Sequence, residues 1–244
     1  MAKLNTNGNA YTIIYAAILV IIVAFLLAFV SSALKPLQEA NVAKDKKQQI
    51  LAALNMRGLS DVEGTYATVI TADIIYGNTP QDVKNDGQAA NEAGEHVSGG
   101  FTVASKDISA DNRPLYVAQV DGQTKYVIPV TGAGLWGGIW GYIALNDDCE
   151  TVFGTYFSHE SETAGLGALI NEQAFQDSFQ GKQLHAEGTE GVALSVVKKG
   201  NEGTLAASNY VHGITGATLT SNGVNNMIKQ GIGAYADILA QRNP

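Results

Sequence analysis

The stretch GITGATLTSNGV, residues 213–224, gathers small and hydroxyl-bearing residues directly before a predicted helix. Thr215, Thr218 and Thr220 are of a type that caps helix N-termini, and the backbone amides at a helix N-terminus also favour a phosphate group. A threonine hydroxyl is a weak nucleophile unless a base activates it, and no catalytic base is evident nearby. On residue chemistry alone, helix capping is the simpler interpretation, and a threonine modified by another enzyme is the alternative.

A second stretch, TGAGLWGGIWGY, contains Gly132, Gly134 and Gly137 at the spacing of a dinucleotide-binding fingerprint. That fingerprint requires a following helix and an acidic residue about 20 positions further on. The sequence continues instead as GIWGYIAL, which predicts a strand and excludes the Rossmann interpretation. The glycines beside Trp136 and Trp140 indicate either a bulged strand with core tryptophans or bare backbone that a flat ligand can approach.

A third stretch, HESETAGLGA at 159–168, begins like the HExxH zinc motif, but position 163 is a threonine. A zincin helix is therefore excluded, and no metal site is predicted. Glu162 and Thr163, followed by Leu166 and Gly167, offer a carboxylate, a hydroxyl and exposed backbone amides in one turn. Such a turn can hold the polar edge of a ring, although a solvated loop with a helix cap explains the same residues equally well.

The composition restricts the class of protein. Among 244 residues only 16% are charged, the net charge is -8 and the sequence pI is about 4.9. An acidic chain without a basic stripe argues against a nucleic-acid partner. The single cysteine, Cys149, can form neither an intrachain disulfide nor a zinc site, and we expect it to be a small apolar residue in a strand.

The apolar excess is concentrated in YTIIYAAILVIIVAFLLAFV, residues 11–30. A helix of this length spans roughly the 30 Å of a bilayer core. A cleaved signal peptide is the alternative, with Ser31-Ser32-Ala33 as the cleavage site, but its apolar region would be shorter. We therefore expect an N-terminal segment at 1–10 and a retained transmembrane helix at 11–33.

Lysines follow this segment at positions 35, 44, 46 and 47. Applied literally, the positive-inside rule places the rest of the chain in the cytoplasm. The resemblance described below implies the opposite orientation, with residues 1–10 in the cytoplasm.

The remaining patterns predict a single α+β domain over residues 61–244, because strands are grouped apart from few helices. A helical stalk is expected at 34–60, separated from the transmembrane helix by a break at Pro36 and ending at Gly58. Asp121-Gly122 predicts a hairpin turn. Strands are predicted at 64–77, 113–130 (a hairpin), 138–145, 149–158 and 191–199. Helices are predicted at 169–180 and 219–239, and a polar surface loop at 78–100.

The segments that carry a resemblance to a known family are, in order, the apolar segment, LKPLQEANVAKDKKQQILAALNMRGL, IPVTGAGLWGGIWGYIAL, HESETAGLGA and TGATLTSNGV. The order of these segments resembles that of the C subunit of the bacterial sodium-translocating NADH:quinone reductase. The resemblance covers nearly the whole chain. It implies that TGAT is a flavinylation motif in which one FMN is joined through a phosphodiester to Thr218, within an FMN-binding part at about 113–240. The residues that it implies around FMN are Thr215, Gly216, Ala217, Leu219 and Thr220 at the phosphate end, and Glu162, Thr163, Leu166, Gly167 and Trp136 along the ribityl chain and isoalloxazine.

Two positions depart from the family pattern. Ala164 replaces the proline of the usual ETPGLG turn, which should only loosen it. His212 stands where the pattern read by the flavin transferase usually begins with an aspartate, which puts the rate of modification in question. The transferase is expected to act outside the cytoplasmic membrane, so the resemblance implies a single-pass inner-membrane protein with a periplasmic domain.

The implied role is electron transfer within a six-subunit membrane complex that couples NADH oxidation and quinone reduction to sodium export. The flavin would carry the chemistry, without a catalytic acid or base from this chain. No stretch resembles a site for NADH, sodium or quinone. Two alternatives stay open: the equivalent subunit of the related ferredoxin-linked ion-pumping complex, against which the stalk and the long 41–112 segment argue, and a flavin-free membrane-anchored binding or assembly module.

Overall fold

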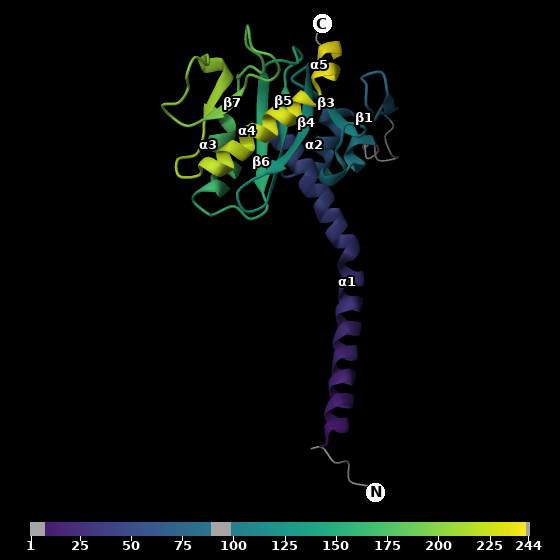
Figure 1. The fold of residues 1–244 in the computed structure, drawn as a ribbon. Coiled ribbons are helices and arrows are strands. Elements are labelled where there is room, and N and C mark those ends of the chain that lie inside the picture. The colour runs from purple at the N-terminus through teal and green to yellow at the C-terminus, as the bar shows by residue number, and fades with distance from the viewer. Residues whose placement is uncertain (1–7, 89–98, 243–244) are drawn as a thin grey trace. The chain divides into compact units, whose positions relative to one another are not determined.

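The computed structural model describes residues 8–88 and 99–242. Part of the expected N-terminal segment and residues 89–98 of the expected polar loop lie outside the described residues. The chain divides into two compact units, with the boundary between Asp45 and Lys46. The first unit holds most of one long helix, and the second is the α+β domain (Figure 1).

Helix α1, Asn9–Ala53, runs without interruption through Pro36, so the predicted break there is wrong. A proline inside a helix removes one backbone hydrogen bond, and the leucine, lysine and alanine residues around it favour the helical conformation. The helix ends before the predicted Gly58. Asn55 adopts a left-handed φ of 61°, and the Met56 amide returns to the Leu51 carbonyl at 2.9 Å, which is the closing bond of a Schellman motif.

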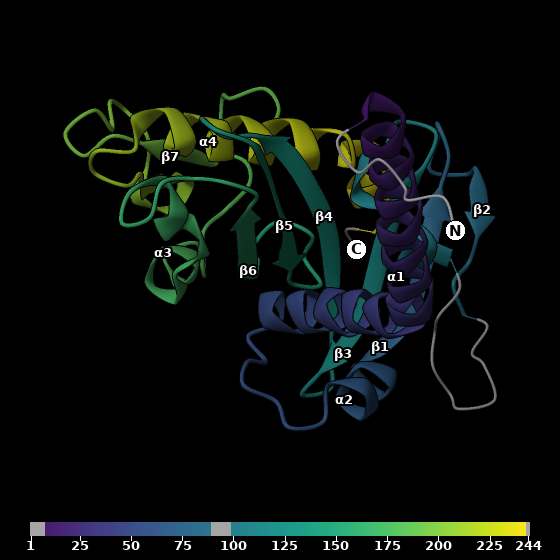
Figure 2. The same cartoon turned by 90° about the horizontal axis from the view of Figure 1, so that it is seen from below.

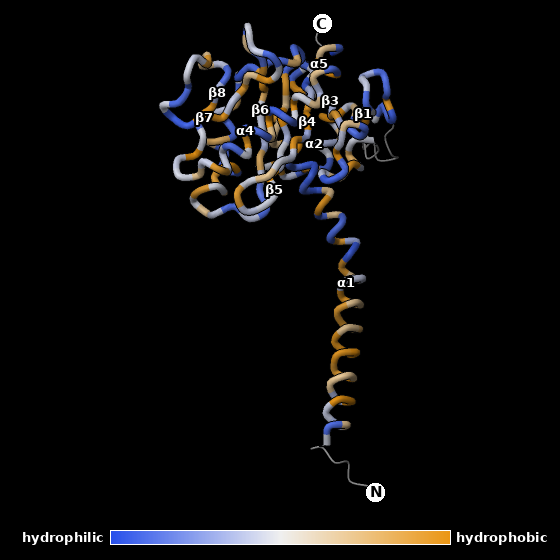
Figure 3. Tube along the Cα trace, viewed as in Figure 1, coloured by the Kyte–Doolittle hydropathy of each residue, from blue (hydrophilic) through white to orange (hydrophobic). Residues whose placement is uncertain are grey.

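The apolar part of α1 is visible as the orange stretch in Figure 3. Its most apolar window has a mean hydropathy of 3.2 and is 0% buried within the protein. By length and composition, α1 is therefore able to cross a membrane.

The domain is built on a six-stranded antiparallel sheet with the order β2-β1-β3-β4-β5-β6. Its strands are β1 Ile70–Tyr76, β2 Val83–Asn85, β3 Arg113–Val120, β4 Gln123–Ala133, β5 Gly138–Leu145 and β6 Val152–His159. The predicted hairpin is confirmed: Asp121 and Gly122 have φ values of 51° and 77° between the paired strands β3 and β4, as a type I′ turn requires. Strands β5 and β6, which correspond to the strands predicted at 138–145 and 149–158, pair with each other.

Cys149 does not lie in a strand as expected. It occupies the turn between β5 and β6 with a φ of 54°, and it is 4% exposed. Burial raises the pKa of its thiol to about 11. The thiol is therefore protonated at neutral pH and unreactive.

The predicted strand at 64–77 is half helix. Helix α2, Val62–Val69, precedes β1. Asp61 caps it by accepting a hydrogen bond from the Gly64 amide at 2.9 Å, and Val62, Tyr66 and Val69 form its buried stripe. The cap and this helical spacing outweigh the strand propensity of the β-branched residues.

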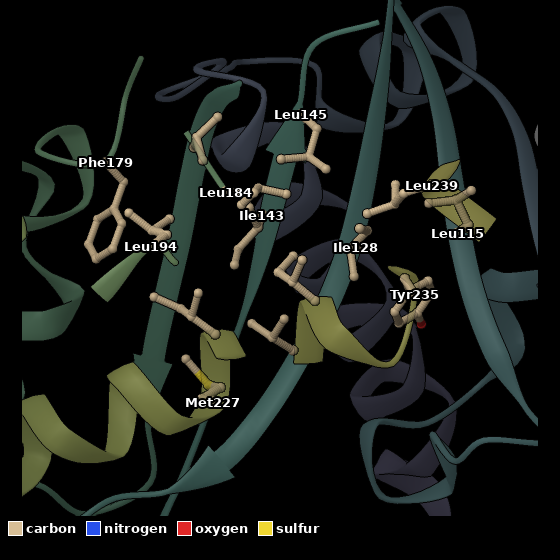
Figure 4. Close-up of a cluster of buried hydrophobic side chains, with 14 of the residues drawn as sticks. Leu115, Ile128, Ile143, Leu145, Phe179, Leu184, Leu194, Met227, Tyr235 and Leu239 are labelled. Carbon is tan, nitrogen blue, oxygen red and sulfur yellow. The ribbon is translucent and has the colours of Figure 1, made fainter. Parts of the chain in front are cut away.

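Helices cover both faces of the sheet (Figure 2). Helix α4, Thr218–Gly233, and helix α5, Ala236–Arg242, pack on one face, where Met227, Ile128 and Ile143 belong to the larger core cluster (Figure 4). The other face buries Ile50 and Tyr66 in a second cluster formed with the last turns of α1 and with α2. The expected α+β class is confirmed.

The single C-terminal helix expected at 219–239 is interrupted at Ala234 and Tyr235. Arg113 is buried and donates to the Ala234 carbonyl at 2.7 Å, while the Tyr235 hydroxyl donates to the Pro114 carbonyl at 2.8 Å. The Arg113 bond satisfies the carbonyl of the residue that ends α4, and the Tyr235 bond ties the interruption to β3. Residue propensities do not reveal either of these long-range bonds.

The other elements are short. Residues 169–180, expected as one helix, form the 3₁₀ turn η3 Gly167–Asn171 and helix α3 Gln173–Asp177. The strand expected at 191–199 is reduced to β7 Ser195–Val197, which pairs in parallel with an unpredicted strand, β8 Tyr210–His212. The remaining turns are η1 Gly99–Thr102, η2 Ser105–Asp107 and η4 Ala207–Asn209.

Candidate cofactor-binding site

Thr218 is the first residue of α4 and is exposed. The residue that precedes it, Ala217, occupies the N-cap position, where no side chain caps the helix. The hydroxyls of Thr215 and Thr218 have no hydrogen-bond partner among the described residues. The interpretation of these threonines as helix caps is therefore wrong, and both hydroxyls are available to a ligand.

The turn that leads into Thr218 has a backbone conformation that requires glycine. Gly216 has a φ of 82°, and a Cβ atom there would lie 3.1 Å from Leu166 Cδ2. The turn is closed from the helix side, because Ser221 Oγ accepts a hydrogen bond from the Ile214 amide at 3.0 Å. The small residues of the motif thus shape the turn, and a serine of α4 fixes it.

Glu162 joins three segments that are distant in the sequence. The residue is 7% exposed, and its carboxylate accepts hydrogen bonds from the Trp136 amide at 2.8 Å and from the Thr220 hydroxyl at 2.5 Å. Burial opposes ionisation, but the bonds from Thr220 and from the amides of Trp136 and Leu135 outweigh it and hold the pKa of Glu162 below its usual value. Glu162 is therefore a buried carboxylate that positions the site, and the solvated-loop interpretation is wrong for it.

Two glycines make room for this carboxylate. A Cβ atom on Gly134 would lie 2.4 Å from Glu162 Oε1, and one on Gly167 would lie 2.4 Å from Glu162 Oε2. Gly134 of GAGLWG and Gly167 of AGLG are thus explained by close approach to one side chain.

Large apolar side chains are exposed around this carboxylate. Trp136 is 66% exposed and Leu219 is 61% exposed, so the core-tryptophan interpretation fails for Trp136. Leu135 and Leu166 are exposed as well, and outside α1 the only other large exposed hydrophobic side chain among the described residues is Val83. Exposed apolar side chains gathered in one place mark a binding surface, and these four come from the three segments that Glu162 joins.

A pocket of about 520 Å³ lies beside the motif. It is lined by Val196, Lys198, Lys199, Gly213, Ile214, Thr215, Gly216, Thr218, Ser221 and Asn222. Thr215, Gly216 and Thr218 thus line one pocket. The two lysines were not predicted, because the parallel β7–β8 pair that brings them here links residues distant in the sequence.

Most of the remaining predicted site residues are buried or make hydrogen bonds within the protein. Ala217 and Thr220 are buried, and the Thr220 hydroxyl is directed to Glu162. Gly167 is buried, while the Thr163 side chain is exposed and its carbonyl accepts from the amides of Leu166 and Ala168, both at 3.1 Å.

His212 contacts a carboxylate outside the TGAT motif. Its Nε2 lies 2.8 Å from Glu202 Oε1. The Gly200 amide also donates to that carboxylate, at 2.7 Å. Backbone amides, first that of Gly200, and then His212 lower the pKa of Glu202. A carboxylate thus lies beside His212, the position at which the resemblance implies an aspartate.

Among the described residues, no group of three or more histidine, cysteine or acidic side chains could hold a metal ion.

Comparison with known proteins places the chain in a family. A family model described as FMN-binding domain matches residues 134–233, which include every predicted site residue. The C subunit of the Na(+)-translocating NADH-quinone reductase of Haemophilus ducreyi is 33% identical over 96% of this chain and 93% of its own length. The corresponding C subunit of Pseudomonas aeruginosa is 29% identical over 92% of this chain and 91% of its own length.

A solved structure agrees with these relatives. The crystal structure of the C subunit of the Na(+)-translocating NADH-quinone reductase from Parabacteroides distasonis superposes with a TM-score of 0.73 at 34% identity, covering 84% of this chain and 96% of that one. The chain therefore belongs to the family of C subunits of the Na(+)-translocating NADH-quinone reductase.

Proposed function

We propose that Thr218 carries FMN through a phosphodiester bond and that the chain passes single electrons within the Na⁺-translocating NADH-quinone reductase complex. The observation that carries the proposal is the exposed Thr218 hydroxyl, without a partner among the described residues, in a pocket of about 520 Å³. The match of residues 134–233 to an FMN-binding domain supports the choice of cofactor.

The residues present fit FMN at both ends of the molecule. The phosphate end needs small residues and hydrogen-bond donors, which the pocket supplies around Gly216 and at the uncapped start of α4. The isoalloxazine needs flat apolar contact, which Trp136, Leu166 and Leu219 offer. These side chains would hold the ring and exclude water from it, while Glu162 keeps their segments together.

Attachment requires a donor with an activated flavin phosphate, a class that includes flavin adenine dinucleotide. The bond between Thr218 Oγ1 and phosphorus forms as the bond between phosphorus and the adenylate oxygen breaks. AMP leaves, the hydroxyl proton passes to the transferase, and no electrons are exchanged. Because no base lies against the hydroxyl within the described residues, the transferase supplies the activation.

Bound FMN would accept and release electrons one at a time. The chain's own contribution is to retain, orient and partly enclose the cofactor. A covalent bond to an exposed position prevents loss by dissociation, which suits a carrier that serves two neighbouring subunits. The sites for NADH, quinone and sodium belong, in this proposal, to those other subunits, which couple electron transfer to sodium export.

The periplasmic placement of the domain gains support from two lysines. Lys46 donates to the carbonyls of Phe101 and Val103 at 2.7 and 2.8 Å, and Lys47 is buried and paired with Glu63. Both are folded into the domain and are not free juxtamembrane charges. Removing them from the positive-inside count weakens the argument for a cytoplasmic domain.

The test is flavin fluorescence of the full-length chain on a denaturing gel after co-expression with an exported flavin transferase. We expect fluorescence from the wild type and Thr218→Ser, and a dark band from Thr218→Ala. Thr215→Ala is the matched control, since it removes a hydroxyl from the same pocket and leaves Thr218 intact. A dark wild-type band, or a fluorescent Thr218→Ala band, would overturn the proposal, and a transferase kept in the cytoplasm should leave the wild type dark.

A further inference from the structure

Two consecutive lysines lie beside the proposed attachment residue. Strands β7 and β8 pair in parallel with Val197 opposite His212, and the Gly213 amide donates to the Val197 carbonyl at 2.8 Å. The chain that leaves β7 therefore runs past the turn that leads to Thr218. Lys198 and Lys199 line the pocket of about 520 Å³ together with that threonine.

Both ammonium groups lack a counterion within the described part of the chain. Lys198 and Lys199 are exposed, and neither makes a hydrogen bond or an ion pair there. Lys46, Lys125 and Lys182 of the same domain do make hydrogen bonds, whereas the exposed Lys106 and Lys229 lie outside this pocket and make none among the described residues. Two unpaired cations beside one pocket are notable in a chain whose net charge is -8.

The pocket itself offers these lysines no anion, because none of its lining residues is acidic. The nearby carboxylate of Glu202 is occupied by the Gly200 amide and by His212. The carboxylate of Glu202 thus holds the loop that follows Lys199. The two lysines therefore add positive charge to a pocket whose lining has no acidic residue.

We propose that Lys198 and Lys199 position the flavin phosphate at Thr218, both in the phosphodiester and in the donor that precedes it. This inference rests on the proposed attachment of FMN. A phosphodiester keeps one negative charge, and an ammonium group binds it as a point charge with several donors. The lysines are positioning residues, and they make the pocket select a phosphorylated flavin over one that lacks phosphate.

The first experiment measures non-covalent binding to the full-length Thr218→Ala chain in detergent, titrating FMN and riboflavin separately by quenching of flavin fluorescence. We expect FMN to bind roughly tenfold more tightly than riboflavin, a typical effect of charge-assisted hydrogen bonds. Adding Lys198→Ala and Lys199→Ala should abolish this preference and leave riboflavin binding unchanged. Adding Lys229→Ala, an exposed lysine of α4 outside the pocket, should preserve it.

The second experiment follows the initial rate of labelling of the chain with an intact Thr218 by purified transferase and flavin adenine dinucleotide. We expect Lys198→Ala/Lys199→Ala to slow labelling roughly tenfold and to reduce its salt dependence, because two screened charges are gone. Lys198→Arg/Lys199→Arg should restore most of the rate, which a purely structural effect would not predict.

The outcomes separate the two proposals. An unlabelled wild-type chain would contradict the attachment to Thr218. A labelled wild type with an equally fast double-alanine variant, or equal FMN and riboflavin affinities in the Thr218→Ala chain, would overturn the role of the lysines and leave the attachment standing.

Discussion

The carboxylate of Glu162 and the hydroxyl of Thr220 are joined by a hydrogen bond of 2.5 Å, with both residues buried. The bond ties the turn after β6 to the first turn of α4, two positions beyond Thr218. The same carboxylate holds the Trp136 amide. The three segments proposed to surround FMN are therefore held together by one side chain.

Thr220→Val should destabilise the domain, because it leaves a buried carboxylate oxygen without its donor. We expect the free energy of unfolding to fall by about 1–3 kcal/mol, measured by chemical denaturation of the full-length chain in detergent. Thr204→Val, in an exposed loop, is the control and should change stability little. Equal stability of both variants would show that this hydrogen bond adds nothing to the fold.

Glu162→Gln should raise the midpoint potential of the attached flavin. The substitution removes a negative charge beside the proposed ring site, and such a charge disfavours addition of electrons. Spectroelectrochemical titration of the flavinylated chain measures the potential. Glu160→Gln, an exposed carboxylate near the same turn, is the matched control and should produce a smaller change. A shift to lower potential for Glu162→Gln would contradict the placement of the ring.

Gly216→Ala should both destabilise the domain and slow flavin attachment. Position 216 has a left-handed φ of 82°, which costs an alanine about 1 kcal/mol, and the added Cβ would press on Leu166 at 3.1 Å. Thermal unfolding and the initial labelling rate measure the two effects. Gly233→Ala, at the end of α4 with no atom within 4 Å of the new Cβ, should instead keep or increase stability.

Stability should depend on pH through Asp73. This carboxylate is 0% exposed, and burial raises its pKa from 3.8 to about 7, opposed by the Phe101 amide and Lys46. Because the folded state holds the proton more tightly than the unfolded chain, this group's contribution is full below about pH 4. This stabilising contribution is lost as pH rises to about 7, which lowers the free energy of unfolding by about 4 kcal/mol at most.

Comparison of the wild type with Asp73→Asn isolates this contribution from those of other carboxylates. The amide keeps an acceptor for the Phe101 amide, which donates to the aspartate at 2.7 Å. The difference in unfolding free energy between the two chains should change between pH 4 and pH 7 in favour of the variant. A difference that is constant over this range would show that Asp73 titrates normally.

The features that could be predicted from the sequence are those that neighbouring residues determine. Asp121-Gly122 specifies its turn locally, and the apolar run at 11–30 specifies a long helix. The strand prediction at 64–77 failed in its first half because a cap at Asp61 outweighs propensity. The hydrogen bonds of Glu162 and the proximity of Lys198 and Lys199 to Thr218 could not be predicted, because each depends on segments that only the folded sheet and the β7–β8 pair bring together.

The parallel pairing of β7 with β8 has a consequence for how the chain can vary in length. The pairing fixes Val197 against His212, so the positions of Lys198 and Thr218 do not depend on how many residues connect the two strands. Gly203, within that connection, has a φ of 60° and no atom near its missing side chain. A peptide epitope inserted there would extend away from the two strands, so the chain could be detected by antibody while flavin attachment proceeds.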